Sequence, residues 1–182
     1  EDLVHIINTL EVTSFRPSVI FGDGDSFINR FYRLLKITPF ALPLACPDAR
    51  FAPIYVGDVV EAMVQSLHNP KTIGQRYELC GPKVYTLKQL VQYTASFLPY
   101  RRHILSLPLQ ISKLQAYLLE YFPGKPFSID NFNSLQADSV CKETFPEIFN
   151  IQPRTLEEIV PQYLTHQSQR NRYGAYRGRA QQ

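Results

Sequence analysis

The sequence lacks the features that would place it across a membrane. No hydrophobic run approaches the roughly 18 residues that a spanning helix needs. No basic segment followed by an apolar one opens the chain, as a signal peptide would. The first residue is Glu1, and Met63 is the only methionine. We therefore expect no membrane span, and we expect a chain that is processed or is part of a longer protein.

Cysteine is scarce, and its spacing fits no metal or redox motif. Cys46, Cys80 and Cys141 are odd in number, lie far apart and form no Cys-x-x-Cys pair. The four histidines also lack a metal spacing such as His-Glu-x-x-His. This pattern predicts reduced, packed thiols in a reducing compartment, and it predicts no metal site.

Charge is modest over most of the chain. The formal net charge of +3 is concentrated at the end, because Arg170, Arg172, Arg177 and Arg179 lie in the last sixteen residues, which hold no acid. Subtracting these four charges leaves a body near −1, so we expect no nucleic-acid binding. A length of 182 residues suits one domain. We predict a domain over 1–166 and a disordered basic tail over 167–182, which has no repeating apolar face.

Hydrophobic periodicity predicts an α/β chain. The strongest strand signal covers 12–21, where a near-continuous apolar run predicts burial on both faces and Pro17 should interrupt pairing. Thr86 and Gln89 have the spacing of a capping box, which predicts a helix start. The remaining pattern predicts helices at 1–10, 26–36, 58–69, 109–122, 129–135 and 155–164, and strands at 40–44, 51–56, 76–80 and 104–107.

The turn after the first strand is the first candidate site. Ligands of α/β proteins bind outside the carboxyl ends of parallel strands. Gly22-Asp-Gly24 resembles a phosphate loop, but the fingerprint requires a third small residue where Phe27 stands. We therefore interpret the turn as facing a substrate. Asp23 and Asp25 lack the further ligands of a calcium loop.

Two arginines each have two interpretations, and one aspartate has a simpler one. A guanidinium at Arg16 within a buried strand must be paired, either in a structural ion pair or beside a cofactor wall formed by Pro17 and Ser18. Arg50 is either a bidentate phosphate ligand or a solvated loop residue. Asp58 is most simply the cap of the helix that follows it.

Three motifs in order carry a family resemblance over about residues 1–165. They are Phe15-Arg-Pro-Ser-Val-Ile-Phe-Gly22, then Phe51-Ala-Pro-Ile-Tyr-Val-Gly-Asp-Val-Val-Glu-Ala62, then Tyr77-Glu-Leu-Cys-Gly-Pro82 with Thr86-Leu-Lys-Gln-Leu90. Together they resemble the carboxyl-terminal part of the extended or atypical short-chain dehydrogenases/reductases, the NAD-dependent epimerase/dehydratase family. The closest wording is that of the branch of NAD(P)-binding accessory subunits of respiratory complex I and their bacterial relatives.

The resemblance implies an α/β fold: the carboxyl-terminal part of a Rossmann-like NAD(P)-binding fold with a small substrate lobe. It implies that Pro17, Ser18 and Val19 lie beside the nicotinamide of NAD or NADP. It also implies that Gly22, Asn29 and Arg50 face the substrate, although the spacing from Arg50 to Asp58 is one residue longer than in typical sugar-nucleotide epimerases.

The resemblance also implies that the catalytic and cofactor-loop motifs of the family lie outside this chain. The Gly-rich cofactor loop and the catalytic Tyr-x-x-x-Lys of that family precede the strand at 12–21. Tyr32 and Lys36 have the Tyr-x-x-x-Lys spacing but come one element too late, and no Gly-x-Ser-x-Gly elbow occurs. We therefore assign no catalytic residue, and we expect weak or absent cofactor binding by this chain alone.

The resemblance to the complex I accessory subunits also implies partners and a location. The partners would be a nicotinamide nucleotide, the amino-terminal half of the same fold and complex I subunits. The location would be cytoplasmic, or peripheral to an energy-transducing membrane on its cytoplasmic or matrix side. Two alternatives stay open: a nucleotide-sugar epimerase or reductase whose catalytic half precedes residue 1, and a structural or assembly protein that keeps the fold without turnover.

Removal of the tail should leave the domain folded. Ordering a polar, apolar-poor segment costs conformational entropy with little burial in return. A chain that ends at His166 should therefore melt within a few degrees of the full chain, as measured by circular dichroism. A large drop in melting temperature would instead mean that the tail docks on the domain.

Overall fold

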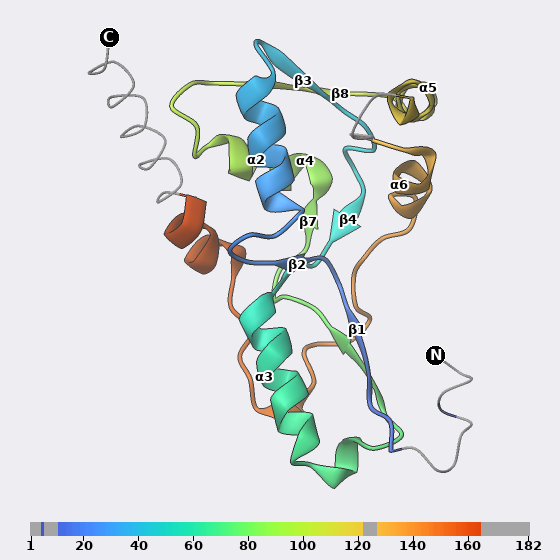
Figure 1. Ribbon diagram of the computed structural model, residues 1–182, viewed down its shortest axis with the longest axis vertical. Coiled ribbons are helices and arrows are strands. Elements are labelled where there is room, and N and C mark those ends of the chain that lie inside the picture. The colour runs from blue at the N-terminus through green and yellow to red at the C-terminus, as the bar shows by residue number, and fades with distance from the viewer. Residues whose placement is uncertain (1–4, 6–10, 122–126, 165–182) are drawn as a thin grey trace.

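The computed structural model describes residues 5, 11–121 and 127–164. The helix expected at 1–10 and the tail expected at 167–182 lie outside the described residues, apart from His5. The proposed domain limits stay a prediction. The described chain is α/β, and Figure 1 shows helices and short strands alternating along it.

The strand predicted at 12–21 forms, but as two pieces. β1 covers Ser14–Pro17 and β2 covers Ile20–Phe21, so the ladder breaks after Pro17, as expected for a residue without an N–H. β1 pairs in parallel with β6, Arg76–Leu79, and β2 pairs in parallel with β5, Ile54–Tyr55. The carboxyl ends of these parallel pairs therefore lie at one edge of the fold.

The expectation that this strand is buried on both faces is wrong for the described chain. Only Phe21 is buried, whereas Arg16, Pro17 and Ile20 are exposed. Arg16 consequently does not need the buried ion pair that its sequence context suggested. Within the described part of the chain, β6 is the only strand that pairs with β1.

The other strands build the region above β2 in Figure 1. β3, Ala41–Leu44, pairs in parallel with β8, His103–Ser106. β4, Arg50–Phe51, pairs antiparallel with β7, Tyr85–Thr86. β3, β8 and the β6 described above agree with the strand signals at 40–44, 104–107 and 76–80. The strand predicted at 51–56 is instead split into β4 and β5, which belong to different sheets, and Val56 already begins α3.

The predicted helices are present, with ends shifted by a few residues. The capping box of α4 is complete: the Thr86 side chain accepts from the Gln89 N–H, and the Gln89 side chain accepts from the Thr86 N–H. Residues 156–164 are also helical. The named helices are α2 (Ile28–Ile37), α3 (Val56–Leu67), α4 (Leu87–Ala95), α5 (Leu109–Glu120) and α6 (Ile129–Ser134), with 3-10 turns η1 (Pro70–Thr72) and η2 (Glu147–Phe149).

Two hydrophobic clusters divide the core. The larger joins α2, α4 and the helix at 156–164, and the largest of its fully buried side chains include Phe21, Leu35, Leu90 and Leu164. The smaller lies between α3, β6 and η2, and it contains Ile54, Val59, Ala62, Leu79 and Phe149. Figure 1 places α2, α4, α5 and α6 on one side of β2 and α3 on the other.

Asp58 does not cap α3, contrary to the sequence expectation. The helix begins at Val56 with Tyr55 as its N-cap residue, which places Asp58 inside the first turn. Its buried carboxylate instead accepts from the Arg154 N–H at 2.7 Å and lies 3.3 Å from the Arg154 Nε. Burial raises the pKa of Asp58, and the contacts with Arg154 oppose that rise. Local spacing could not reveal a partner 96 residues away.

The expectation of three reduced thiols is wrong for two of them. Cys80 and Cys141 form a disulfide with Cα atoms 5.9 Å apart, although 61 positions separate them in the sequence. Fold geometry, not spacing, brings them together, so the cysteine pattern gives no argument for a reducing compartment. Cys46 is a buried free thiol, as expected, and burial raises its pKa.

The disulfide should stabilise the fold by constraining the unfolded chain. We expect Cys80→Ser/Cys141→Ser to lose about 2–4 kcal/mol of unfolding free energy, since the bond closes a long loop. Urea unfolding with and without dithiothreitol measures this. The reductant should destabilise the parent and leave the double variant unchanged. Equal stability of parent and variant would show that the bond does not form.

Candidate functional site

The residues predicted to face the cofactor lie at the carboxyl end of β1. Pro17 is exposed, and Ser18 and Val19 are partly buried. The Ser18 Oγ donates to the Ser139 carbonyl at 2.5 Å and accepts from the Ala52 N–H at 3.3 Å. Its hydroxyl is thus used to fix the backbone, and the exposed ring of Pro17 is left as the available surface.

A distant segment supports this strand end. The Ser139 carbonyl also accepts from the Ala52 N–H at 3.0 Å, and the Ser139 N–H donates to the Arg50 carbonyl at 2.8 Å. The Arg50 N–H donates to the Asp138 carboxylate at 3.1 Å. Together with the Cys80–Cys141 disulfide, these bonds hold residues 138–141 against β4 and against the Ser18 side chain.

Of the three residues predicted to face a substrate, Gly22 and Asn29 meet at the Asp25 carboxylate through their N–H groups, and among the described residues Arg50 has no such contact with the turn. Gly22 is buried, and a side chain there would come 2.7 Å from the Val56 Cγ1, so the turn requires glycine. Asn29 is 4% exposed within α2. Arg50 is exposed at the start of β4. None of the three lines the cavity described below. Their substrate role stays a prediction.

Asp25 is the residue of this turn that sequence reasoning undervalued. Its carboxylate accepts from the Phe27 N–H at 2.8 Å, the Asn29 N–H at 3.2 Å and the Gly22 N–H at 3.3 Å. It also accepts from the Tyr163 hydroxyl at 3.1 Å. Burial, and then the Asp25 charge, raise the pKa of Tyr163, so its phenol stays protonated and donates. The signal was present, because Asp just before a helix commonly satisfies the first N–H groups.

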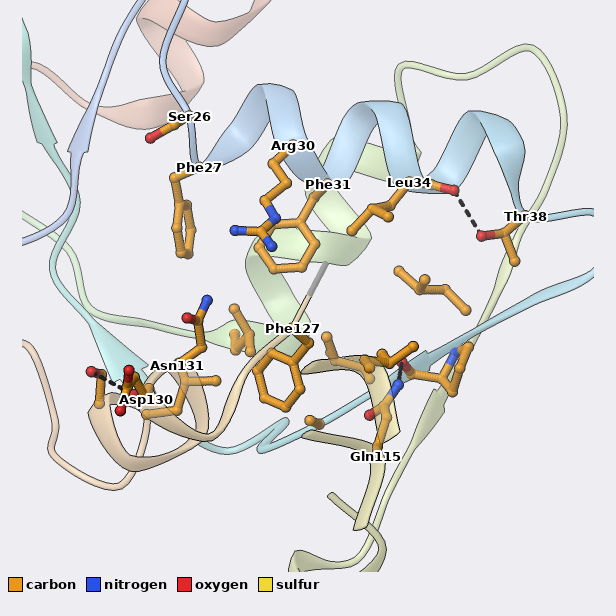
Figure 2. Close-up of a pocket in the computed structure, with 18 of the residues that line it drawn as sticks. Ser26, Phe27, Arg30, Phe31, Leu34, Thr38, Gln115, Phe127, Asp130 and Asn131 are labelled. Carbon is orange, nitrogen blue, oxygen red and sulfur yellow. Dashed lines mark hydrogen bonds between the residues drawn. The ribbon is translucent and has the colours of Figure 1, made fainter. Parts of the chain in front are cut away.

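A cavity of about 650 Å³ lies in the region formed by α2, β3, α5 and α6, and we call it the small-lobe cavity. α2 forms one wall, and β3, α5 and α6 form the others. Figure 2 shows Phe27 and Phe31 on the α2 side and Phe127 and Asn131 across from them. Sequence analysis did not identify these side chains as a site, since they come from segments that share no local motif.

The described residues contain neither a metal-binding cluster nor a membrane-spanning helix. Within 5, 11–121 and 127–164, no group of three or more His, Cys, Asp or Glu side chains could hold a metal ion. No helix in that part of the chain is both long and apolar enough to cross a membrane.

The fold is that of the NAD(P)-binding epimerases and dehydratases. The structure resembles Pal from Bacillus thuringiensis with a TM-score of 0.64, at 15% identity, over 91% of this chain and 49% of that one. It resembles the UDP-glucose 4-epimerase of Thermotoga maritima with a TM-score of 0.59, at 14% identity, over 94% of this chain and 50% of that one. It resembles a DesIV double mutant (dTDP-glucose 4,6-dehydratase) from Streptomyces venezuelae with a TM-score of 0.60, at 13% identity, over 89% of this chain and 45% of that one. The Rossmann-like fold class predicted from the motifs is thereby confirmed.

In sequence, the chain is related to a complex I subunit. It is 27% identical over 149 residues, 76% of this chain and 37% of the relative, to NADH dehydrogenase (ubiquinone) 1 alpha subcomplex subunit 9, mitochondrial, of Arabidopsis thaliana. The mouse protein of that name is 29% identical over 86% of this chain and 43% of the relative. The resemblance to the accessory-subunit branch of the epimerase/dehydratase family is therefore confirmed. No protein-family model matches.

The chain spans about two fifths of the length of the curated relatives it matches. What those relatives do as whole proteins therefore comes to this chain only as a proposal.

Asp25 should be the most sensitive position of the strand–turn–helix. We expect Asp25→Ala to cost about 2 kcal/mol, because it leaves N–H groups at a helix start without an acceptor. Tyr163→Phe should cost about 1 kcal/mol, since a single donor is lost. Urea unfolding measures both. If the two contact each other as described, the double variant should cost less than the sum of the two single losses, and strict additivity would contradict the contact.

Proposed function

We propose that this chain is part of an NAD(P)-binding protein of the complex I accessory-subunit type, and that the chain itself has no turnover. The nicotinamide would lie against Pro17, Ser18 and Val19. The observation that carries this proposal is the strand end fixed by Ser139, because a preorganised surface at the carboxyl end of a parallel strand is where α/β folds bind nucleotides.

The absence of turnover rests on the chemistry of the strand end. General acid–base catalysis requires a side chain with a tuned pKa near the reacting atom. In the described chain, the Ser18 hydroxyl is bonded to a backbone carbonyl, and Tyr32 is buried in the large hydrophobic cluster. Neither is placed as an acid or base beside Pro17.

Complex I subunits are the proposed partners, and the proposed location is peripheral to an energy-transducing membrane on its matrix or cytoplasmic side. The names of the curated relatives support this, since they are mitochondrial subunits. An exposed apolar face of α3 supports a partner of some kind, because such patches usually mark interfaces. That face comprises Val56, Val60, Met63, Val64 and Leu67. We propose that the amino-terminal half of the same fold covers it.

Nucleotide titration tests the proposal. We expect this chain to bind NADH or NADPH saturably, with a dissociation constant weaker than about 1 μM. The only described helix start after a Gly-containing turn is that of α2, and its Phe27 and Asn29 N–H groups already donate to Asp25, so they are not available to the pyrophosphate. Chemical-shift mapping should locate the effect at residues 17–19. Pro17→Glu should abolish binding through charge repulsion, whereas Pro99→Glu, also at an exposed proline, should not.

Two results would contradict the proposal in different ways. Binding that is equal in Pro17→Glu and the parent would remove the strand end as the cofactor wall. A chain-dependent change in the absorbance of reduced nicotinamide, measured with the purified protein, would show turnover and favour the enzyme alternative.

A further inference from the structure

The small-lobe cavity has walls that are mostly apolar. Its volume of about 650 Å³ falls within the range of small-molecule sites. Two aromatic contacts shape its α2 side: the Phe27 ring centroid lies 5.3 Å from that of Phe31 and 5.5 Å from that of Phe51. Leu34, Leu44, Leu119 and Phe127 complete much of the apolar lining. A molecule with an apolar body would exclude water from this surface favourably.

The cavity adjoins the proposed cofactor wall. Phe51 lines the cavity, and the next residue, Ala52, donates its N–H to the Ser18 Oγ at 3.3 Å. Phe51 itself is only 5% exposed, and its ring packs against that of Phe27 on the cavity lining. A molecule in the cavity would thus lie beside the strand end without overlapping Pro17.

A few polar groups on the cavity lining would orient a bound molecule. Arg30 descends from α2 toward the side where Phe127 and Asn131 lie, as Figure 2 shows. The Gln115 side chain donates from Nε2 to the Pro43 carbonyl at 3.3 Å. Its Oε1 is buried and has no hydrogen-bond donor within the described part of the chain. Because this oxygen is closed off from the cavity, Arg30 is the polar group of the two that can face a bound molecule.

The charge of the lining limits the ligand class. Among the described lining residues, Arg30 is the one cation, and Asp130 places an opposite charge on the same lining. A nucleoside diphosphate carries at least two negative charges and is usually held by several cations or N–H groups. The lining therefore suits a ligand with one negative charge at most.

We propose that this cavity binds an apolar organic monoanion. Its ring- or chain-bearing body would occupy the space between Phe31, Leu44 and Phe127. Its anionic group would face Arg30. This site goes beyond the proposed nucleotide function and does not rest on it, because none of its lining residues belongs to Pro17–Val19.

Two matched fluorescent probes and two matched pairs of variants test the site. 1-Anilinonaphthalene-8-sulfonate has an aromatic body and one anionic group, and N-phenyl-1-naphthylamine is its uncharged counterpart. Ser134→Trp fills the cavity from α6, and Asn133→Trp adds the same bulk to the same helix outside the lining. Arg30→Gln removes the charge within the cavity, and Arg33→Gln removes one from an exposed position of α2.

We expect Ser134→Trp to abolish saturable binding of both probes, and Asn133→Trp to leave it unchanged. Arg30→Gln should weaken binding of the sulfonate probe about tenfold, which is the effect expected for loss of a charge-assisted hydrogen bond. Binding of the neutral probe should be unaffected. Arg33→Gln should change neither. UDP-glucose should not displace the sulfonate probe. Melting curves of all four variants establish that each is folded.

The opposite results would overturn the proposal. Equal binding by Ser134→Trp and Asn133→Trp would place the probes elsewhere, for example on the exposed face of α3. Equal weakening of both probes by Arg30→Gln would remove the anion contact. Displacement by UDP-glucose would replace the apolar monoanion with a nucleotide sugar. Since neither probe is a nicotinamide nucleotide, none of these results depends on binding at Pro17.

Discussion

The backbone of Ser139 is the contact on which the rest of the structure depends. Its carbonyl accepts from both the Ser18 hydroxyl and the Ala52 N–H, and its N–H donates to the Arg50 carbonyl. A carbonyl can accept two hydrogen bonds, so this group is fully used. One residue thereby connects the end of β1, the strand β4 and a segment more than a hundred positions further along. The Cys80–Cys141 disulfide secures the same segment to the end of β6.

This connection sets the relation between the two hydrophobic clusters. One cluster packs on α2 and α4 and the other on α3, and the short strands that meet near Ser139 run between them. Two further long-range contacts fasten the clusters to the carboxyl-terminal segment. Tyr163 donates to Asp25 at the start of α2, and Arg154 meets Asp58 in the first turn of α3.

The described chain has a ready-made surface for a ligand but few groups for chemistry. Polar side chains at the strand end are already occupied with backbone partners, and the cavity is walled by aromatic and aliphatic groups. Catalysis needs groups that change protonation or charge beside the reacting atom, and the proposal of binding without turnover rests on that requirement. Relatedness to a complex I subunit and the fold shared with epimerases and dehydratases are the two findings from which the proposed function starts.

The sequence by itself determined the local elements, since these depend on spacing within a few residues. The capping box at Thr86, the break in the strand at Pro17 and the helices α2 and α5 were all predicted from neighbouring residues. The family motifs gave the fold class and placed the strand end. Only the tertiary structure decided which distant groups meet: Ser18 with Ser139, Asp25 with Tyr163, and Cys80 with Cys141. Those pairs, and the cavity between α2 and α6, arise from packing of whole elements, and no pattern along the chain encodes which side chains such packing will bring together.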